Sequence, residues 1–196
     1  MDEIPTTSLA DFLGREQVMD IGVRSLWTPV PRVGGPAFTV RCAPGDNLML
    51  HAAIYRAEPG SIIVVEAGDV DYAVAGGNVC AVAQRRGIAA FVVDGVIRDL
   101  GEVREMRFPV FARGVIPIPG TKKAIAPLNG QVRCGGATVN PGDVVVADEE
   151  GIVVVPRARA EEVFAQAKAK LAKEADESLD AWERAHRARI EAALTE

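Results

Sequence analysis

The chain has 196 residues, of which 48% are hydrophobic and 25% are charged, and its net charge is −5. This balance is typical of one globular domain with a full-sized core, and no apolar run reaches the roughly 18 residues that a membrane span needs. Acidic residues outnumber basic ones by 27 to 22, so we expect no nucleic-acid partner and no membrane association. The amino terminus lacks the basic start and apolar core of a signal peptide, which predicts a cytoplasmic protein.

Cysteine and histidine are scarce, and this limits the kinds of metal site. The three cysteines are far apart and odd in number, which does not indicate a disulfide framework. With only two histidines, a zinc site built from Cys and His is also disfavoured. A bound metal should therefore be a hard cation that carboxylates and water can hold.

The first half of the chain alternates predicted strands with predicted helices. Three short runs rich in β-branched residues, bracketed by Gly or Pro, predict buried strands at residues 37–40, 62–65 and 91–93. Helices are predicted over residues 47–56 and 78–86, and Gly87 is a suitable residue to end the second. This alternation predicts a layered α/β core.

The following segment consists of closely spaced predicted strands. They lie at residues 109–113, 131–134, 137–139, 144–146 and 152–155. Turn signals such as Asn140-Pro141-Gly142-Asp143 separate them. The short spacing favours antiparallel β structure folded against the α/β part.

The carboxyl-terminal segment has a helical pattern from about Ala158 to the end. Apolar residues recur at spacings of three, four or eight residues between Phe164 and Ile190. A long helix with such a narrow apolar stripe cannot bury that stripe on one small domain. We therefore expect a single α/β core domain over residues 1–157 and a helical extension over residues 158–196 that packs on a neighbouring subunit.

Two predicted strand-to-helix junctions lie about twenty residues apart and carry the residues suited to chemistry. At the first, Gly76 and Gly77 precede a helix, where the backbone N–H groups of Asn78 and Val79 are free to hold an anion. Glycine there lets a carboxylate approach the backbone closely. In folds of this kind, ligands bind beyond the carboxyl ends of the strands.

The second junction carries Arg98 and Asp99. An arginine can bind a carboxylate bidentately, and an aspartate beside it can hold Mg²⁺ or Mn²⁺. A carboxylate cradle, an arginine and a metal are together what a bound 2-oxo acid requires. The metal would polarise the oxo group and stabilise the enolate left when the adjacent carbon–carbon bond breaks.

Each of these residues also has a purely structural interpretation. A double glycine before a helix is usually a turn, and Arg98 could form a surface ion pair. Asp99 and Glu102 fit a capping box, which is our preferred interpretation of Glu102 and leaves capping and metal binding both open for Asp99. Asp94 and the glycine after it are expected to form the turn that ends the strand.

Taken together, the motifs resemble the family that unites the regulator of ribonuclease activity A with the class II 4-hydroxy-4-methyl-2-oxoglutarate and 4-carboxy-4-hydroxy-2-oxoadipate aldolases. The resemblance covers roughly residues 20 to 175. It rests on Gly87-Ile88, Val92-Val93-Asp94-Gly95, Arg98-Asp99, Phe108 to Gly114, and Pro141-Gly142-Asp143 through Asp148 to Pro156.

The resemblance implies a swivelling β/β/α-type layered sandwich with a long C-terminal helix, assembled as homotrimers or hexamers with active sites at the subunit interfaces. It also implies Mg²⁺ or Mn²⁺ dependence and aldol cleavage to pyruvate, often with oxaloacetate decarboxylation as a second activity. Arg98 would be the catalytic residue that binds the carboxylate and keto oxygen of a small 2-oxo acid. Asp99 would ligate the metal directly, and Glu174 would reach its water shell from the neighbouring subunit. The substrate-binding backbone would be that of Gly76, Gly77, Asn78 and Val79.

The chain departs from the aldolase pattern at Gly77, where those enzymes carry an acidic residue that helps hold metal-bound water and move protons. Asp69 or Asp71 could compensate for that missing carboxylate. Asp99 is retained, whereas the ribonuclease-regulating branch typically loses it. We therefore expect a metal-dependent lyase, with decarboxylation less demanding than aldol cleavage. The alternative is a non-catalytic regulator that binds a ribonuclease, and a methyltransferase ranks last because no G-x-G-x-x-G fingerprint is present.

Overall fold

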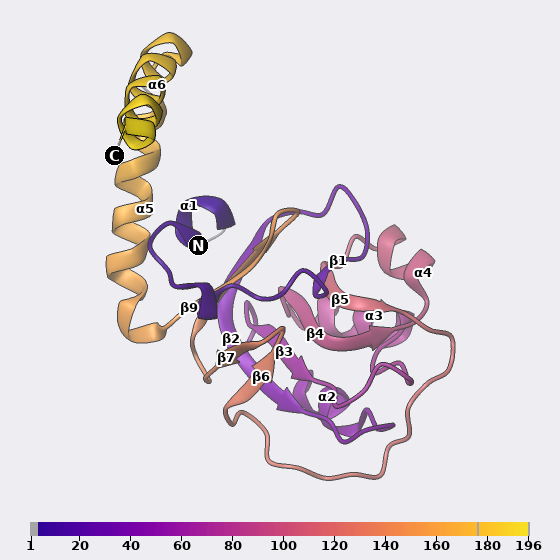
Figure 1. The fold of residues 1–196 in the computed structure, drawn as a ribbon. Coiled ribbons are helices and arrows are strands. Elements are labelled where there is room, and N and C mark those ends of the chain that lie inside the picture. Colours follow the sequence, from indigo (N-terminus) through magenta and orange to yellow (C-terminus); the bar gives the residue numbers. More distant parts are fainter. Residues whose placement is uncertain (1–3, 176, 196) are drawn as a thin grey trace.

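A seven-stranded sheet with the strand order β1-β5-β4-β3-β2-β8-β9 forms the centre of the molecule, and a two-stranded ribbon of β6 and β7 lies beside it. The computed structural model describes residues 4–175 and 177–195 (Figure 1). The strands are β1 (Arg24–Ser25), β2 (Val33–Arg41), β3 (Ile62–Glu66), β4 (Ala90–Ile97), β5 (Val110–Val115), β6 (Val132–Cys134), β7 (Ala137–Val139), β8 (Val144–Asp148) and β9 (Gly151–Val155). The helices are α1 (Thr6–Ala10), α2 (Leu48–Ala53), α3 (Gly77–Arg85), α4 (Leu100–Glu105), α5 (Ala160–Ala175) and α6 (Leu179–Thr195).

The four strands β2, β3, β4 and β5 run parallel to one another and form the middle of the sheet. Residues 62–65 and 90–93 are fully buried, which explains why these segments read as continuous apolar runs rather than as alternating ones. Helix α2 and the β6–β7 ribbon both pack against β3. The sheet is thus covered on both faces, and the fold is the expected α/β class, a β/β/α-type layered sandwich.

The sequence-based prediction for β5 was wrong in its direction. Residues 109–113 were grouped with antiparallel strands, but β5 pairs in parallel with β4, with Phe91 opposite Val110. Helix α4 makes the crossover between the two strands, and its six residues are too few to give a clear helical pattern. Antiparallel structure does occur in β8 and β9, which extend the same sheet through β2 rather than forming a separate one.

The strand β4 also continues further than expected. It runs to Ile97 with an irregular register between Val93 and Val96, so Asp94 does not end it in a turn. The carboxylate of Asp94 instead accepts hydrogen bonds from Arg113 and from the backbone N–H of Gly135. These two bonds fix the β6–β7 ribbon and β5 against β4.

The carboxyl-terminal segment forms two helices instead of one continuous helix. The second begins after Ser178, whose hydroxyl oxygen accepts a hydrogen bond from the N–H of Ala181 and so caps α6. The first half of α5 packs on its own chain, because Val163 and Ala167 are buried in a small second core with α1, β8 and β9. The prediction of a single helix is therefore wrong, and only part of α5 contacts the core.

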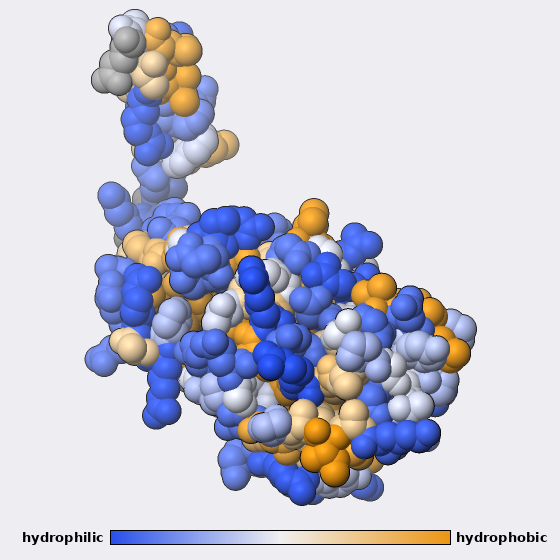
Figure 2. Space-filling model, turned by 60° about the horizontal axis from the view of Figure 1, so that its bottom comes forward, coloured by the Kyte–Doolittle hydropathy of each residue, from blue (hydrophilic) through white to orange (hydrophobic). Residues whose placement is uncertain are grey.

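Helix α6 projects from the globular part and has no buried residue (Figure 1). Its exposed apolar side chains recur at spacings of three, eight and four residues along one stripe: Leu179, Trp182, Ile190 and Leu194. Figure 2 shows apolar residues gathered along one side of this protruding end. No helix in the described residues is long and apolar enough to cross a membrane.

Candidate active site

The two junctions that the sequence singled out lie side by side at one edge of the sheet. Strands β3 and β4 are parallel neighbours, so the segments after them leave the sheet at the same edge. The backbone N–H of Arg98 donates a hydrogen bond of 2.9 Å to the carbonyl of Ala75. The N–H of Gly77 donates one of 3.0 Å to the Asp99 carboxylate. The predicted proximity of the Gly-Gly and Arg-Asp pairs is therefore present.

Close carboxylates occupy the space that a side chain at either glycine would take. A Cβ placed on Gly76 would lie 2.4 Å from Oδ2 of Asp99. A Cβ placed on Gly77 would lie 1.8 Å from Oε2 of Glu102. The missing side chains at positions 76 and 77 thus make room for two carboxylates that arrive from the β4–α4 junction.

A cavity of 70 Å³ lies between these junctions. Because sites for drug-sized ligands measure roughly 300–1,000 Å³, a cavity this small suits a small acid. Its walls include five residues singled out by the sequence: Gly76, Asn78, Val79, Arg98 and Asp99. Gly77 does not line the cavity, and its N–H is already bonded to Asp99. Its predicted contact with substrate is thus replaced, in this structure, by a bond to the neighbouring carboxylate.

The amino-terminal end of α3 provides free donors at the cavity. The first intrahelical bond runs from the N–H of Cys80 to the carbonyl of Gly76. Among the described residues, the N–H groups of Asn78 and Val79 have no partner, as expected in the first turn of a helix. These two N–H groups, together with the helix dipole, favour an anionic ligand.

Asp99 occupies the N-cap position of α4, but its side chain makes no cap bond, so the capping-box interpretation of Asp99 and Glu102 is wrong. No side-chain cap bond forms at this helix, and Asp99 adopts a left-handed backbone with φ 58°. That conformation turns its carboxylate toward Gly77 and away from the α4 amides. Its Oδ2 lies 3.5 Å from Nε of Arg98, and both side chains remain about two-fifths exposed, at 37% and 42%. A carboxylate and a guanidinium are therefore both available to a ligand.

Three further polar residues line the cavity and were not identified from the sequence. Asn47 and His51 come from the start of α2, and Lys122 comes from the loop that follows β5. Lys122 is exposed at the surface and also lines this cavity. The only available sequence signal was the spacing of four residues between Asn47 and His51, which places them on one helix face.

The charge of the cavity is set by Lys122, Arg98, His51 and Asp99. Burial lowers the pKa of His51 below its usual 6.5, and the nearby Lys122 ammonium lowers it further. Both effects favour the neutral imidazole, whereas the backbone of Val74 acts in the opposite direction and raises this pKa. The cavity thus combines two cationic side chains with one neutral base and one carboxylate.

The carboxylates at this site suit a hard divalent cation that takes few ligands from the protein. The carboxylate of Asp99 lies next to Gly76, and that of Glu102 lies next to Gly77. In the part of the chain that the structure describes, no cluster of three or more His, Cys, Asp or Glu forms a ready-made metal cage. Mg²⁺ usually keeps several waters and binds through one or two carboxylates, which matches this donor set.

Neither of the acids that could compensate for Gly77 lines the cavity. Asp69 is used locally, because its carboxylate accepts hydrogen bonds from the N–H groups of Gly45, Asp71 and Tyr72. Asp71 is exposed and does not line the cavity. The carboxylate beside Gly77 is that of Glu102.

Glu174 is not part of this cavity within one chain. It lies on α5, where its carboxylate forms an ion pair of 3.3 Å with Lys170. Figure 1 shows α5 far from α3 and α4. The prediction that Glu174 reaches the metal site of a neighbouring subunit stays a prediction.

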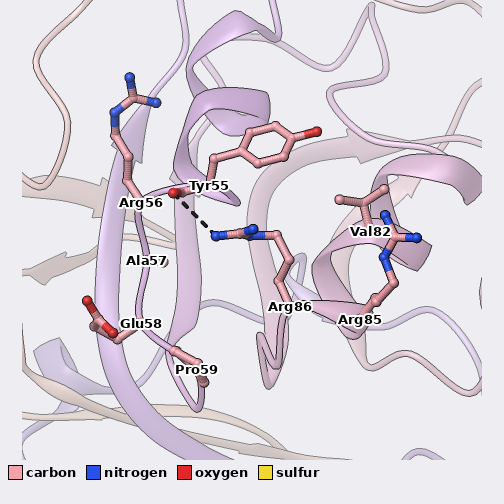
Figure 3. A pocket seen from close by; sticks show the side chains of 8 residues that line it. All are labelled: Tyr55, Arg56, Ala57, Glu58, Pro59, Val82, Arg85 and Arg86. Carbon is pink, nitrogen blue, oxygen red and sulfur yellow. Dashed lines mark hydrogen bonds between the residues drawn. The ribbon is translucent and has the colours of Figure 1, made fainter.

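A larger cavity of 440 Å³ lies between the ends of α2 and α3 (Figure 3). Its arginines do not converge on a common point: Arg56 points away from Arg85 and Arg86. Arg86 is used structurally, since it donates hydrogen bonds to the carbonyls of Ile54 and Tyr55. This cavity therefore has fewer free groups for a ligand than the small one.

Fold and site together define a class of protein: a layered α/β domain with a small cavity at the carboxyl ends of parallel strands. The comparisons then give the family. The model of the RraA-like family, Aldolase/RraA, matches residues 3–154. The chain belongs to this family.

Three of the similar proteins carry either an aldolase name or an RraA name. A protein of Halalkalibacterium halodurans named "Putative 4-hydroxy-4-methyl-2-oxoglutarate aldolase" is 41% identical over 170 residues, which cover 86% of this chain and 80% of that protein. The RNA-processing inhibitor RraA of Thermus thermophilis has a TM-score of 0.71 and 27% identity, covering 79% of this chain and 93% of its own. RraAS2 of Streptomyces coelicolor is described as an unusual member of the RNase ES inhibitor RraA family. It has a TM-score of 0.78 and 29% identity, and the match covers 95% of this chain and 93% of RraAS2.

Proposed function

We propose that this chain is a divalent-metal-dependent lyase that breaks the carbon–carbon bond next to a 2-oxo acid and releases pyruvate. The substrates would be of the 4-hydroxy-4-methyl-2-oxoglutarate type, oxaloacetate, or both. The observation that carries the proposal is the convergence of Arg98, Asp99 and two free helix N–H groups on one small cavity. The name of the H. halodurans relative supports a lyase.

Each group has a role in this reaction. The N–H groups of Asn78 and Val79 would bind the carboxylate of the 2-oxo acid at the start of α3. The Arg98 guanidinium would orient that acid and stabilise the negative charge that develops on its keto oxygen. Asp99, with Glu102 near it, would hold Mg²⁺ or Mn²⁺, which supplies a Lewis acid for the keto group.

The site would be completed by a second copy of the chain in a homotrimer or hexamer. Helix α6 exposes its apolar stripe, with Leu179 76% and Leu194 78% exposed, and a stripe of this kind is suited to packing on another protein surface. In such an assembly, Glu174 of a neighbouring copy would approach the water shell of the metal.

The test is pyruvate release from oxaloacetate with Mg²⁺ or Mn²⁺, repeated with EDTA. The Asp99→Ala variant is compared with Glu58→Ala, which removes an exposed carboxylate at the other cavity. We expect metal-dependent turnover in the wild type and in Glu58→Ala, and its loss in Asp99→Ala. No turnover above the metal-only background, together with no metal binding, would refute the lyase.

The second candidate is a non-catalytic regulator that binds a ribonuclease, and the two RraA relatives favour it. Direct binding to a ribonuclease can be measured by surface plasmon resonance. Inhibition of that nuclease by Asp99→Ala as well as by the wild type would support a regulator, because the metal-site carboxylate would then not be required.

A further inference from the structure

Helix α6 carries a seam of mostly apolar residues that lies open at the surface. The seam residues recur at successive spacings of three, four, four and three: Leu179, Trp182, His186, Ile190 and Ala193. At about 100° per residue, these positions fall within about 80° of one another around the helix. No residue of α6 is buried, and Figure 2 shows the apolar side of this protruding end. The seam is therefore accessible to a partner.

The seam has the same pattern in both directions along the helix. Trp182 and Ile190 lie four positions from His186, one on each side. Leu179 and Ala193 lie seven positions from it, again one on each side. Two antiparallel copies of α6, related by a twofold axis at His186, would therefore place apolar residues against apolar residues along the whole seam. Most oligomers of identical chains are closed by twofold axes of this kind, at which one surface patch meets itself.

The charged residues beside the seam favour antiparallel over parallel pairing. Glu183 and Arg187 lie on one flank, at about 40° and about 80° from Leu179, and both are exposed. In an antiparallel pair this flank meets the same flank of the second copy, so Glu183 would face Arg187 of the second copy in two symmetric contacts. In a parallel pair it would meet the opposite flank, which brings Arg187 toward Arg189 of the second copy. Charges beside a helix seam set orientation in this way.

The opposite flank of the seam faces the protein's own helix α5. There, Ala185 and Arg189 line a cavity of 390 Å³ together with Lys170 of α5. A second copy would therefore approach from the other side. The seam and the flank that carries Glu183 and Arg187 are on that accessible side.

His186 is the polar residue of the seam and would fix its register. Its ring stacks on that of Trp182, with ring centroids 4.6 Å apart and planes at 9°. At the twofold axis, each imidazole would lie beside that of the second copy, where a ring N–H of one can donate to a ring nitrogen of the other. A shifted register would place each imidazole against an apolar residue and leave its polar atoms unpaired. A single polar residue in a helix seam specifies register for this reason.

We propose that α6 is a self-association element, in which the helices of two copies of this chain pair antiparallel about a twofold axis at His186. The partner of the exposed stripe is thus the same stripe of a second copy. This pairing goes beyond the proposed lyase and does not depend on its activity. Because α6 projects from the globular part, the paired helices would join two globular parts without covering either (Figure 1).

Cysteine cross-linking tests the twofold axis. The native cysteines are buried, so a cysteine introduced on α6 supplies the accessible thiol. Under mild oxidation, His186→Cys should give a covalent dimer on a non-reducing gel, because a residue on the axis meets itself within the reach of a disulfide, about 4.4–6.8 Å between Cα atoms. Arg184→Cys is the matched control and should stay monomeric, since two residues turn the helix by about 200°.

A second set of variants leaves His186 unchanged. Leu179→Cys alone should not cross-link to itself in an antiparallel pair, and neither should Ala193→Cys. A mixture of the two, with one chain carrying a size tag, should cross-link, because each position faces the other across the seam. Self-linking of Leu179→Cys would indicate a parallel pair, and no link at any of these positions would mean that α6 packs elsewhere. Either result would overturn the proposal.

Charge reversal tests the flank that carries Glu183 and Arg187. Glu183→Arg alone and Arg187→Glu alone would each place like charges across the axis, so self-association measured by sedimentation equilibrium should weaken by about five- to thirtyfold. An equimolar mixture of the two variants restores opposite charges at both contacts and should pair within about twofold of the wild type. A mixture no tighter than either variant alone would overturn the antiparallel arrangement. Neither measurement uses a substrate, so these outcomes are separate from those of the lyase assay.

Discussion

The N–H of Gly77 donates a hydrogen bond of 3.0 Å to the carboxylate of Asp99, which joins the start of α3 to the junction before α4. This bond aligns one oxygen of Asp99 and leaves the other available. It depends on close approach, since a Cβ on the preceding residue, Gly76, would lie 2.4 Å from the same carboxylate. The position of Asp99, the proposed metal ligand, therefore depends on two glycines: Gly77 donates the hydrogen bond, and Gly76 leaves room for the carboxylate.

Gly76→Ala should weaken metal binding by displacing Asp99. Loss of a group that orients a metal ligand typically costs about 10- to 100-fold in affinity, and we expect a loss of this order for Mn²⁺. The measurement is a Mn²⁺ titration followed by electron paramagnetic resonance. Gly101→Ala is the matched control, because a Cβ there meets nothing within 4 Å. Equal affinities in the two variants would contradict a role for the close approach.

An acid introduced at position 77 should be able to replace the carboxylate of Glu102. Gly77→Asp alone should lower the melting temperature and activity, because its Cβ would overlap Oε2 of Glu102, 1.8 Å away. Adding Glu102→Ala removes the overlap and moves the carboxylate to the position that the aldolases use. Thermal unfolding and pyruvate release of both single variants and the double variant form a double-mutant cycle, and we expect a coupling of about 0.5–3 kcal/mol. Additive effects would mean that the two positions are independent.

The sequence predicted the parts of the site that follow from local pattern and parallel strands. Gly76 and Arg98 each follow a recognisable buried strand, and adjacent parallel strands end at one edge, so their proximity was predictable. Glu102 was misassigned because an acid three residues after an Asp is also the pattern of a capping box. Only the left-handed backbone at Asp99 distinguishes the two interpretations.

Lys122 and His51 could not be found from the sequence because long-range backbone bonds place them together. The loop that carries Lys122 is tied to distant segments by hydrogen bonds from Thr121 to the carbonyl of Gly45 and from Gly120 to that of Ala73. Hydrophobic periodicity in the sequence does not indicate such long-range backbone hydrogen bonds. The antiparallel prediction for β5 failed for a related reason, since the short crossover helix α4 lacks a strong local signal.

Asp46 should make stability depend on pH in the acidic range. Burial alone would raise the pKa of this carboxyl, but hydrogen bonds from the N–H groups of Leu48 and Lys123 and from the Thr121 hydroxyl lower it to about 2. Because its pKa is lower in the folded state, Asp46 stabilises fully above its ordinary pKa of 3.8. That contribution is lost as pH falls from about 4 to about 2.

The comparison that isolates this contribution is urea unfolding of the wild type and Asp46→Asn. The wild type should be more stable at pH 7, and the difference in unfolding free energy should shrink between pH 4 and pH 2. Because Asp46 holds the start of α2 and the loop of Lys122, KM for a 2-oxo acid should also rise in the variant. If the difference in unfolding free energy did not change with pH, the charge of Asp46 would not contribute to stability.

Trp182 should be required for assembly if α6 packs on another copy of the chain. It is 46% exposed on the apolar stripe, whereas the exposed Arg184 lies on nearly the opposite face, because two residues turn an α-helix by about 200°. Trp182→Glu should therefore lower the mass measured by light scattering, and Arg184→Ala should not. An unchanged mass in Trp182→Glu would mean that the stripe is not an interface.

Complementation between two inactive variants tests whether assembly completes the site. Asp99→Ala should lack the metal ligand, and Glu174→Gln should lack the carboxylate offered to a neighbouring copy. Unfolding and refolding the two together would form mixed oligomers in which about a quarter of the sites combine an intact Asp99 with an intact Glu174 from the adjacent copy. We expect pyruvate release to recover to about that fraction of the wild type. No recovery, with mixed oligomers confirmed by mass spectrometry, would show that Glu174 does not act across an interface.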